Sequence, residues 1–313
     1  MLNRQMPFGV AELCFRGRDA CPVRGCVEAS PCPTHHIAVH STRPHGFTYV
    51  YDKQWRNKNL LWADADDQAR LEAILRGKRE SRMGHEHSED AVTWNVFRFF
   101  ERHGCLSRAI GTICPCPDDE PLTVFWTTHD GCLWEPYRCC SDQIPERASA
   151  RSESDLIFLW ENKLVVVIEA KFRSPNRSDP KNRESESRKA EPYIKHASGY
   201  LSRDEVKVAV RDGWYELMRN WVLGMKLKDM LVCETFVLVN LLRKRHENEH
   251  HEDPRRDFAE PACVLSPNSR FVIEYWEDLI AAAPSICDHP DSSVLVSWAR
   301  NKSELMGKPA FDF

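Results

Sequence analysis

The order of apolar and polar residues predicts alternating helices and strands from about residue 88 onward. The stretch Ser88–Phe100 has apolar residues at helical spacing, so we expect an amphipathic helix that faces a core. Ser88 is a good helix cap, and two acids follow it where the helix dipole favours negative charge. Glu89 is then either a capping acid at the rim of the core or a ligand that points into a site.

Two apolar runs predict a central β-hairpin. Residues 155–160 and 164–172 are strand-like, and the three polar residues between them form a plausible tight turn. The second run is almost continuously apolar, which is typical of a strand covered on both faces. Because side chains alternate along a strand, its two faces are predicted separately. One face carries Val165, Val167, Glu169 and Lys171, and the other carries Val166, Ile168, Ala170 and Phe172.

The remaining elements follow from the same periodicities. We expect a strand near Gly46–Tyr51, helices over Asp64–Arg79 and Asp212–Met230, a strand over Phe236–Leu242, and a strand followed by a helix around Phe271–Ala282. Residues 105–150 are expected to hold loops and short strands, and residues 173–191 a solvated loop of mixed charge. This alternation predicts an α/β fold with a central mixed sheet flanked by helices.

The predicted hairpin brings together the residues with the clearest chemistry. If the turn centres on Asn162, Asp155 and Glu169 lie equally far from it and become cross-strand partners with Cβ atoms about 5 Å apart. A turn shifted by one residue would break this pairing. Two carboxylates so close repel each other unless a cation or a proton lies between them.

Such a carboxylate pair suits Mg²⁺ or Mn²⁺, since Mg²⁺ prefers oxygen ligands and often takes only one or two from protein. Lys171 could orient a water molecule beside the metal, and Glu89 could supply a third acidic ligand. The alternative is structural: Asp155 begins a strand, and Glu169 forms an ordinary ion pair with Lys171.

The order of these elements resembles the PD-(D/E)XK nuclease superfamily, which has the restriction-endonuclease-like fold. The resemblance rests on Glu89, Asp155 and the Glu169-Ala-Lys171 triplet, and it spans about residues 88 to 242. It implies that Glu89, Asp155 and Glu169 are metal ligands, that Lys171 orients the attacking water, and that the reaction is hydrolysis of DNA phosphodiester bonds. Ser154 replaces the proline of the family pattern. A role in restriction or defence against foreign DNA is an analogy with the family.

A cluster of cysteines and histidines precedes this region. We therefore divide the chain into a Cys/His-rich region, 1–80, and a nuclease-like domain, 81–313. The candidate metal ligands of the Cys/His-rich region are Cys14, Cys21, Cys26, Cys32 and His35. They could hold a structural Zn²⁺ or an iron–sulfur cluster, or they could be ordinary reduced thiols.

Composition narrows the class of protein without naming a substrate. The 313 residues are 42% hydrophobic, which is enough for a folded core, and the formal charge is only −4. Any DNA-binding surface must therefore be a local patch. No apolar run suggests a membrane span or a secretory signal, so we expect a cytoplasmic protein with reduced cysteines. A homodimer would suit cleavage of both strands of a duplex. Two alternatives to a nuclease are a nucleic-acid-binding protein that does not cut and a zinc-dependent hydrolase that uses the Cys/His cluster.

Overall fold

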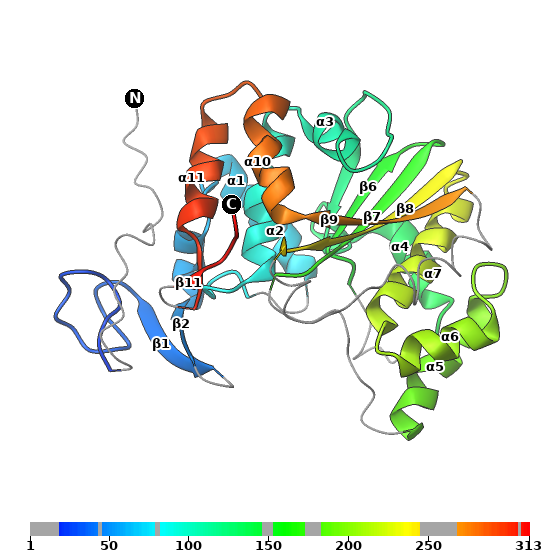
Figure 1. The fold of residues 1–313 in the computed structure, drawn as a ribbon, viewed down its shortest axis with the longest axis horizontal. Coiled ribbons are helices and arrows are strands. Elements are labelled where there is room, and N and C mark those ends of the chain that lie inside the picture. Colours follow the sequence, from blue (N-terminus) through cyan, green and yellow to red (C-terminus); the bar gives the residue numbers. More distant parts are fainter. Residues whose placement is uncertain are drawn as a thin grey trace.

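A seven-stranded mixed β-sheet forms the centre of the molecule, with helices on both faces (Figure 1). The computed structural model describes residues 19–42, 46–78, 82–145, 153–172, 183–244, 268–305 and 308–313. Its strands are β1 (Ile37–Thr42), β2 (Gly46–Tyr51), β3 (Leu122–Phe125), β4 (Thr128–His129), β5 (Cys132–Leu133), β6 (Leu156–Trp160), β7 (Leu164–Ala170), β8 (Thr235–Leu242), β9 (Ser269–Tyr275), β10 (Ser303–Leu305) and β11 (Lys308–Pro309). Its helices are the 3₁₀ helix η2 (Lys53–Asn59), α1 (Ala65–Gly77), α2 (Glu89–Arg102), α3 (Leu106–Gly111), α4 (Glu135–Asp142), α5 (Arg183–His196), α6 (Arg203–Arg211), α7 (Tyr215–Met230), α10 (Trp276–Ile286) and α11 (Asp291–Asn301).

The strand order in the sheet is β5-β4-β3-β6-β7-β8-β9. The pairs from β5 to β7 are antiparallel, and β7, β8 and β9 are parallel. Strand β7 therefore lies inside the sheet, between antiparallel β6 and parallel β8, and all seven of its residues are buried. The predicted α/β class, with a central mixed sheet flanked by helices, is confirmed.

Each face of the sheet has its own hydrophobic core. Helices α1, α2, α10 and α11 cover one face, where α2 contributes residues such as Trp94 and Phe97. Helices α4 to α7 cover the other face, where α7 contributes Trp221. Along β7 the predicted alternation holds, because Val166 and Ile168 belong to the first core and Val165 and Val167 to the second.

The hairpin register agrees with the sequence prediction. Leu156 pairs with Ile168, and Trp160 pairs with Leu164, so the turn centres on Asn162. Asn162 has a φ of 59°, in the left-handed region that asparagine tolerates better than most residues. The helix cap also holds: the side chain of Ser88 accepts a hydrogen bond from the Ala91 N–H at 3.0 Å.

Two loop predictions were wrong in part. Residues 105–150 include helices α3 and α4 as well as short strands. Residues 183–191 of the expected solvated loop lie in helix α5. The segment is rich in strong helix formers, and Ala190 and Tyr193 bury against the second core. The predicted helix over Asp212–Met230 begins later, at Tyr215. Gly213, at φ 88°, separates it from α6, which the periodicity did not reveal.

The N-terminal strands form a small unit beside the main body (Figure 1). Strands β1 and β2 pair with each other, and a separate hydrophobic cluster lies against them. Backbone hydrogen bonds from Tyr51 to Gly84 and from Glu86 to Tyr49 join the unit to the main body. Helix α1 packs into the first core through Leu71 and Ile74. Among the described residues, no helix is long and apolar enough to cross a membrane.

Candidate active site and metal centre

The hairpin places Asp155 and Glu169 side by side at one end of the sheet. The observed pairing of Leu156 with Ile168, continued by one residue, puts these two acids opposite each other. Asp155 also accepts a hydrogen bond from the backbone N–H of Ala170, with the nitrogen 2.8 Å from Oδ2. This bond holds the Asp155 carboxylate against the end of β7, beside Glu169.

Lys171 joins two carboxylates in this buried network. Its Nζ lies 2.6 Å from Glu169 Oε1 and 2.6 Å from Glu216 Oε2, and its side chain is only 8% exposed. The Asn220 amide donates a hydrogen bond to the other oxygen of Glu169, at 2.5 Å. Ser154 Oγ donates in turn to Asn220 Oδ1, at 3.1 Å. Both oxygens of Glu169 therefore have protein partners.

The electrostatics show how tightly these charges are packed. Burial, reinforced by the charge of Glu169, raises the pKa of Asp155 well above its usual range. Burial also raises the pKa of Glu169, against the attraction of Lys171. For Lys171 itself burial opposes the charge, but the surrounding acids, Glu169 first, outweigh it and raise the pKa. Lys171 therefore offsets only part of the repulsion between the carboxylates of Asp155 and Glu169.

Helix α7 supplies further side chains to the site, among them Glu216, which the sequence analysis did not place there. Glu216, Arg219 and Asn220 are spaced so that they share one face of the helix. The charges of Lys171 and Arg219 lower the pKa of Glu216 in spite of its burial. Arg219 is 7% exposed, and its pKa is raised by Glu169 and Glu216 although burial opposes its charge. The only sequence signal was their helical spacing among apolar residues.

Glu89 reaches the same end of the sheet from α2, on the opposite face. Its Oε1 accepts a hydrogen bond from the Phe172 N–H at 3.0 Å, just beyond β7. Among the described residues, however, Glu89, Asp155 and Glu169 are not a group whose ligand oxygens all lie within 4.8 Å of one another. The expected acids converge on one strand end, with Asp155 and Glu169 as the close pair.

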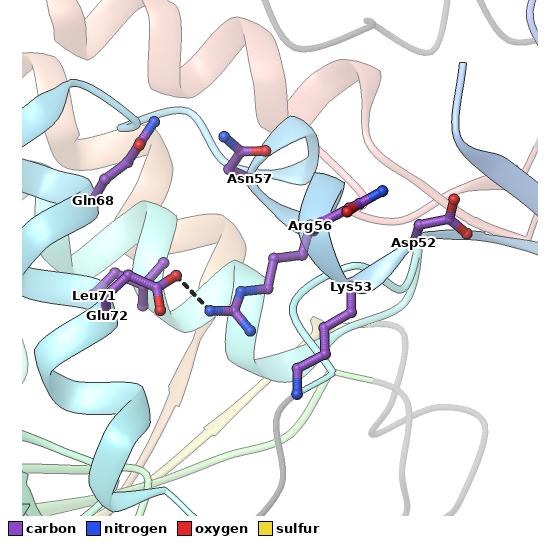
Figure 2. Close-up of a pocket in the computed structure, with 8 residues that line it drawn as sticks. Asp52, Lys53, Arg56, Asn57, Gln68, Leu71 and Glu72 are labelled. Atoms are coloured by element: carbon purple, nitrogen blue, oxygen red, sulfur yellow. Dashed lines mark hydrogen bonds and ion pairs between the residues drawn. The ribbon is translucent and has the colours of Figure 1, made fainter. Parts of the chain in front are cut away.

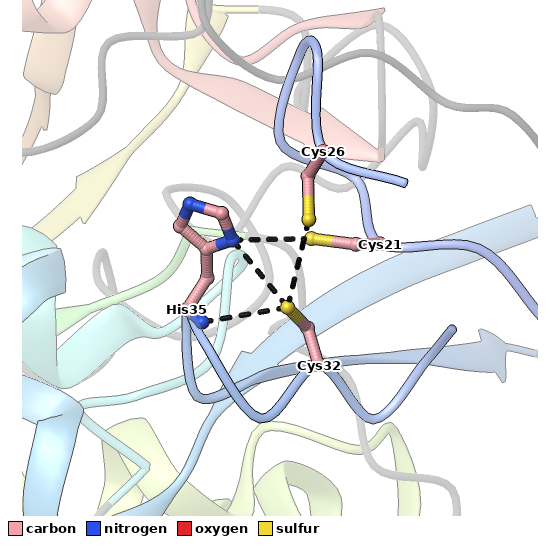
Figure 3. A group of neighbouring side chains, drawn as sticks. All are labelled: Cys21, Cys26, Cys32 and His35. Carbon is pink, nitrogen blue, oxygen red and sulfur yellow. Dashed lines mark hydrogen bonds between the residues drawn. The ribbon is translucent and has the colours of Figure 1, made fainter. Parts of the chain in front are cut away.

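A second site lies in the N-terminal unit, where Cys21, Cys26, Cys32 and His35 face one another (Figure 3). The Cys26 and Cys32 sulfurs are 3.8 Å apart, and His35 Nδ1 lies 3.4 Å from the Cys32 sulfur and 3.6 Å from that of Cys21. Tetrahedral zinc, with bonds of about 2.3 Å to sulfur and 2.05 Å to nitrogen, requires edges of about 3.8 and 3.6 Å. The group can therefore bind a metal such as zinc. Cys14 lies outside the described residues.

Four protein ligands would fill a tetrahedral coordination shell, which is the arrangement of structural zinc sites. All four ligand atoms lie within 4.8 Å of one another, so they leave room for one ion and not for a cluster of several irons. Burial raises the pKa of Cys21 to about 12. At Cys32 hydrogen bonds, chiefly from the His35 backbone, outweigh burial and lower the pKa, which favours a thiolate there.

A surface cleft is lined by residues that belong to neither site. It has a volume of about 620 Å³ and lies between η2 and α1 (Figure 2). Arg56 crosses it to pair with Glu72, with Nη2 and Oε1 2.5 Å apart. The residues that line it do not include Asp155, Glu169 or Lys171.

Comparison of the chain with models of protein families, with curated proteins and with solved structures gave no match.

Proposed function

We propose that the protein is a metal-dependent nuclease with a restriction-endonuclease-like core that hydrolyses phosphodiester bonds in DNA. The observation that carries this proposal is the register of the hairpin, which pairs Leu156 with Ile168 and so brings Asp155 and Glu169 to adjoining strand ends, with Lys171 bonded to Glu169. The described order of helix α2, strands β6 and β7, helix α7 and strand β8 agrees with the layout that the resemblance implies.

The donor set fits a divalent cation such as Mg²⁺ or Mn²⁺. Two carboxylates are the number that Mg²⁺ often takes from protein, and a cation would relieve the repulsion that raises the pKa of Asp155. Asp155 and Glu169 would hold the metal, with Glu89 as a more distant acid. When bound, the metal would polarise a phosphoryl oxygen and acidify a water molecule.

The other side chains would position the acids and balance their charge. Asn220 holds Glu169, and Ser154 holds Asn220, so the serine in place of the family's proline has a hydrogen-bonding role. Lys171 would place positive charge beside the phosphate that is attacked. Its bond to Glu216 would have to loosen for Lys171 to reach that phosphate.

A second candidate is a nucleic-acid-binding protein that keeps this fold but does not cut. The observation that favours it is that both carboxylate oxygens of Glu169 already have protein partners, Lys171 and Asn220, in place of a metal ion. The third alternative, a hydrolase that works through the Cys/His cluster, is less suited to the geometry because four protein ligands leave no open position for substrate.

The test is cleavage of supercoiled plasmid, linear duplex and single-stranded DNA, with Mg²⁺, Mn²⁺ or EDTA. Wild type should cut with metal and not with EDTA, and Asp155→Ala and Lys171→Ala should each lose activity by at least about a hundredfold. Lys244→Met is the matched control, because Lys244 pairs with Asp278 at 2.5 Å on the surface. DNA binding without cutting by folded wild type would favour the second candidate. Equal cutting by all variants would refute the site.

A restriction or defence role and a homodimer on duplex DNA remain part of the proposal. Both follow from the resemblance, and double-strand cleavage kinetics together with the solution mass would test them.

A further inference from the structure

A second set of metal-ligating side chains lies at the end of α2 opposite to Glu89. His103 is the C-cap of α2, while His289 and Asp291 flank Pro290 in the turn between α10 and α11. Although far apart in sequence, the three residues place their ligand atoms within 4.8 Å of one another. The two imidazole rings stack with centroids 3.9 Å apart.

The two nitrogen-to-oxygen distances in this group are longer than ordinary hydrogen bonds, and the shorter one matches the edge of a tetrahedral metal site. His103 Nε2 lies 3.4 Å from Asp291 Oδ2, and His289 Nδ1 lies 3.8 Å from the same oxygen. A hydrogen bond from nitrogen to oxygen usually spans about 2.7–3.2 Å. A tetrahedral zinc ion with bonds of about 2.05 Å to nitrogen and oxygen requires edges of about 3.3 Å.

One ring nitrogen in this group makes an ion-pair contact but no hydrogen bond within the described part of the chain. Among the described residues, the buried Nε2 of His103 has no hydrogen-bond partner. Buried polar atoms are usually satisfied, so an exception that faces a carboxylate calls for an explanation. A metal ion at this position would satisfy the nitrogen lone pair.

Asp291 supplies the negative charge of this group, and the neighbouring cation Arg102 is held by Asp64 and Asp67. A neutral imidazole offers a ring lone pair to a cation.

We propose that His103, His289 and Asp291 bind a divalent transition-metal ion of the zinc type, with water in the fourth position. The His289 side chain is 44% exposed, which gives the ion and its water access from solvent. Two histidines and one carboxylate are a common zinc donor set when one position stays open. The ion would fasten the α10–α11 turn to the end of α2. This site is separate from the proposed nuclease centre and does not depend on it.

Binding requires a change in the position of the His289 ring. Two imidazoles that bind one tetrahedral ion have ring centroids about 5 Å apart. The rings of His103 and His289 are stacked at 3.9 Å, so His289 must move out of the stack. The Asp291 backbone N–H donates a hydrogen bond to His289 Nδ1 at 3.2 Å, and that bond uses the lone pair that the metal would need. Either this hydrogen bond breaks and Nδ1 binds the metal, or the His289 ring rotates so that Nε2 points toward the metal. Because His289 is partly exposed, either change is open to it.

The test is titration of the full-length, metal-free protein with Co²⁺, followed by optical absorption. The thiolates of Cys21, Cys26 and Cys32 should give sulfur-to-cobalt charge-transfer bands as their site fills. Filling of the proposed site should add tetrahedral d–d absorption without further thiolate bands. His289→Ala and Asp291→Asn should each weaken this second phase by at least about tenfold.

Two controls separate this site from others. His129→Ala removes a histidine that lies 3.3 Å from Asp130 on the surface, and it should leave the second phase unchanged. Asp155→Asn disables the proposed nuclease centre and should also leave it unchanged. The proposal is overturned if folded wild type shows no second phase, if both His289→Ala and Asp291→Asn retain it, or if Asp155→Asn removes it. Circular dichroism establishes that each variant is folded.

Discussion

Replacing Lys171 with methionine removes a cation that forms ion pairs with both Glu169 and Glu216, and keeps a side chain of similar length. Each contact is 2.6 Å long, and Lys171 and Glu169 are both almost fully buried. The variant therefore leaves the two acids with the charge of Arg219 but without the ion pair to Lys171.

The expected cost follows from these distances. At an effective dielectric constant of about 20, unit charges 2.6 Å apart attract by about 6 kcal/mol. Much of this only offsets the cost of desolvating the charges. Removing one partner of a buried ion pair costs about 3–5 kcal/mol, and we expect Lys171→Met to lower the free energy of unfolding by this amount. Lys244→Met, at an exposed pair of similar length, should cost less than about 1 kcal/mol.

The pH dependence has a defined sign. The folded-state pKa of Glu216 is lowered, so its ion pair contributes stability above the ordinary carboxyl pKa and loses it as pH falls. The gap between wild type and Lys171→Met should therefore be widest near neutral pH and should narrow below about pH 4.

Urea denaturation with and without MgCl₂ at constant ionic strength measures both effects. If Asp155 and Glu169 can hold Mg²⁺, the ion at ten times its Kd should restore about 1.4 kcal/mol to Lys171→Met. It should restore none to the double variant Asp155→Asn/Lys171→Met. A loss below 1 kcal/mol, or equal effects of Mg²⁺ on the single and double variants, would refute this reasoning.

Three further predictions follow from the same contacts. The folded-state pKa of Asp155 is raised, so the wild-type protein loses stability as the pH rises through that pKa. By urea denaturation, Asp155→Asn should be more stable than wild type by about 1 kcal/mol at pH 7 and as stable as wild type near pH 3. Cys32→Ser should lose the thiolate-bound equivalent of zinc, measured by elemental analysis, and amide exchange should quicken in β1 and β2 but not in α2. Burial lowers the pKa of Lys302 to about 8, so the stability of wild type relative to Lys302→Met should rise by up to about 3 kcal/mol between pH 8 and 10.5; a flat difference would contradict this.

The hairpin and its two acids were predictable because local rules decide them. Alternation along β7 and the symmetry about Asn162 place Asp155 opposite Glu169 without any knowledge of the rest of the fold. The helix that carries Glu89 was predictable for the same reason, since Ser88 and an apolar stripe define its start.

The partners of these acids were not predictable, because tertiary packing brings them together. Glu216 reaches Lys171, and Asn220 reaches Glu169, only because α7 packs across the face of β7. Helix α5 was missed because its polar sequence shows little apolar periodicity, and its burial depends on neighbouring helices. His103 and His289 meet only because the α10–α11 turn packs beside the end of α2.

The account depends most on a divalent cation that binds between Asp155 and Glu169. Anomalous diffraction from crystals of the wild-type protein soaked in MnCl₂ tests this directly. We predict a peak about 2.1 Å from an oxygen of each carboxylate, with no such peak in Asp155→Asn. Wild-type crystals at saturating Mn²⁺ that show no peak there, with Lys171 still joined to Glu169 and Glu216, would contradict the account.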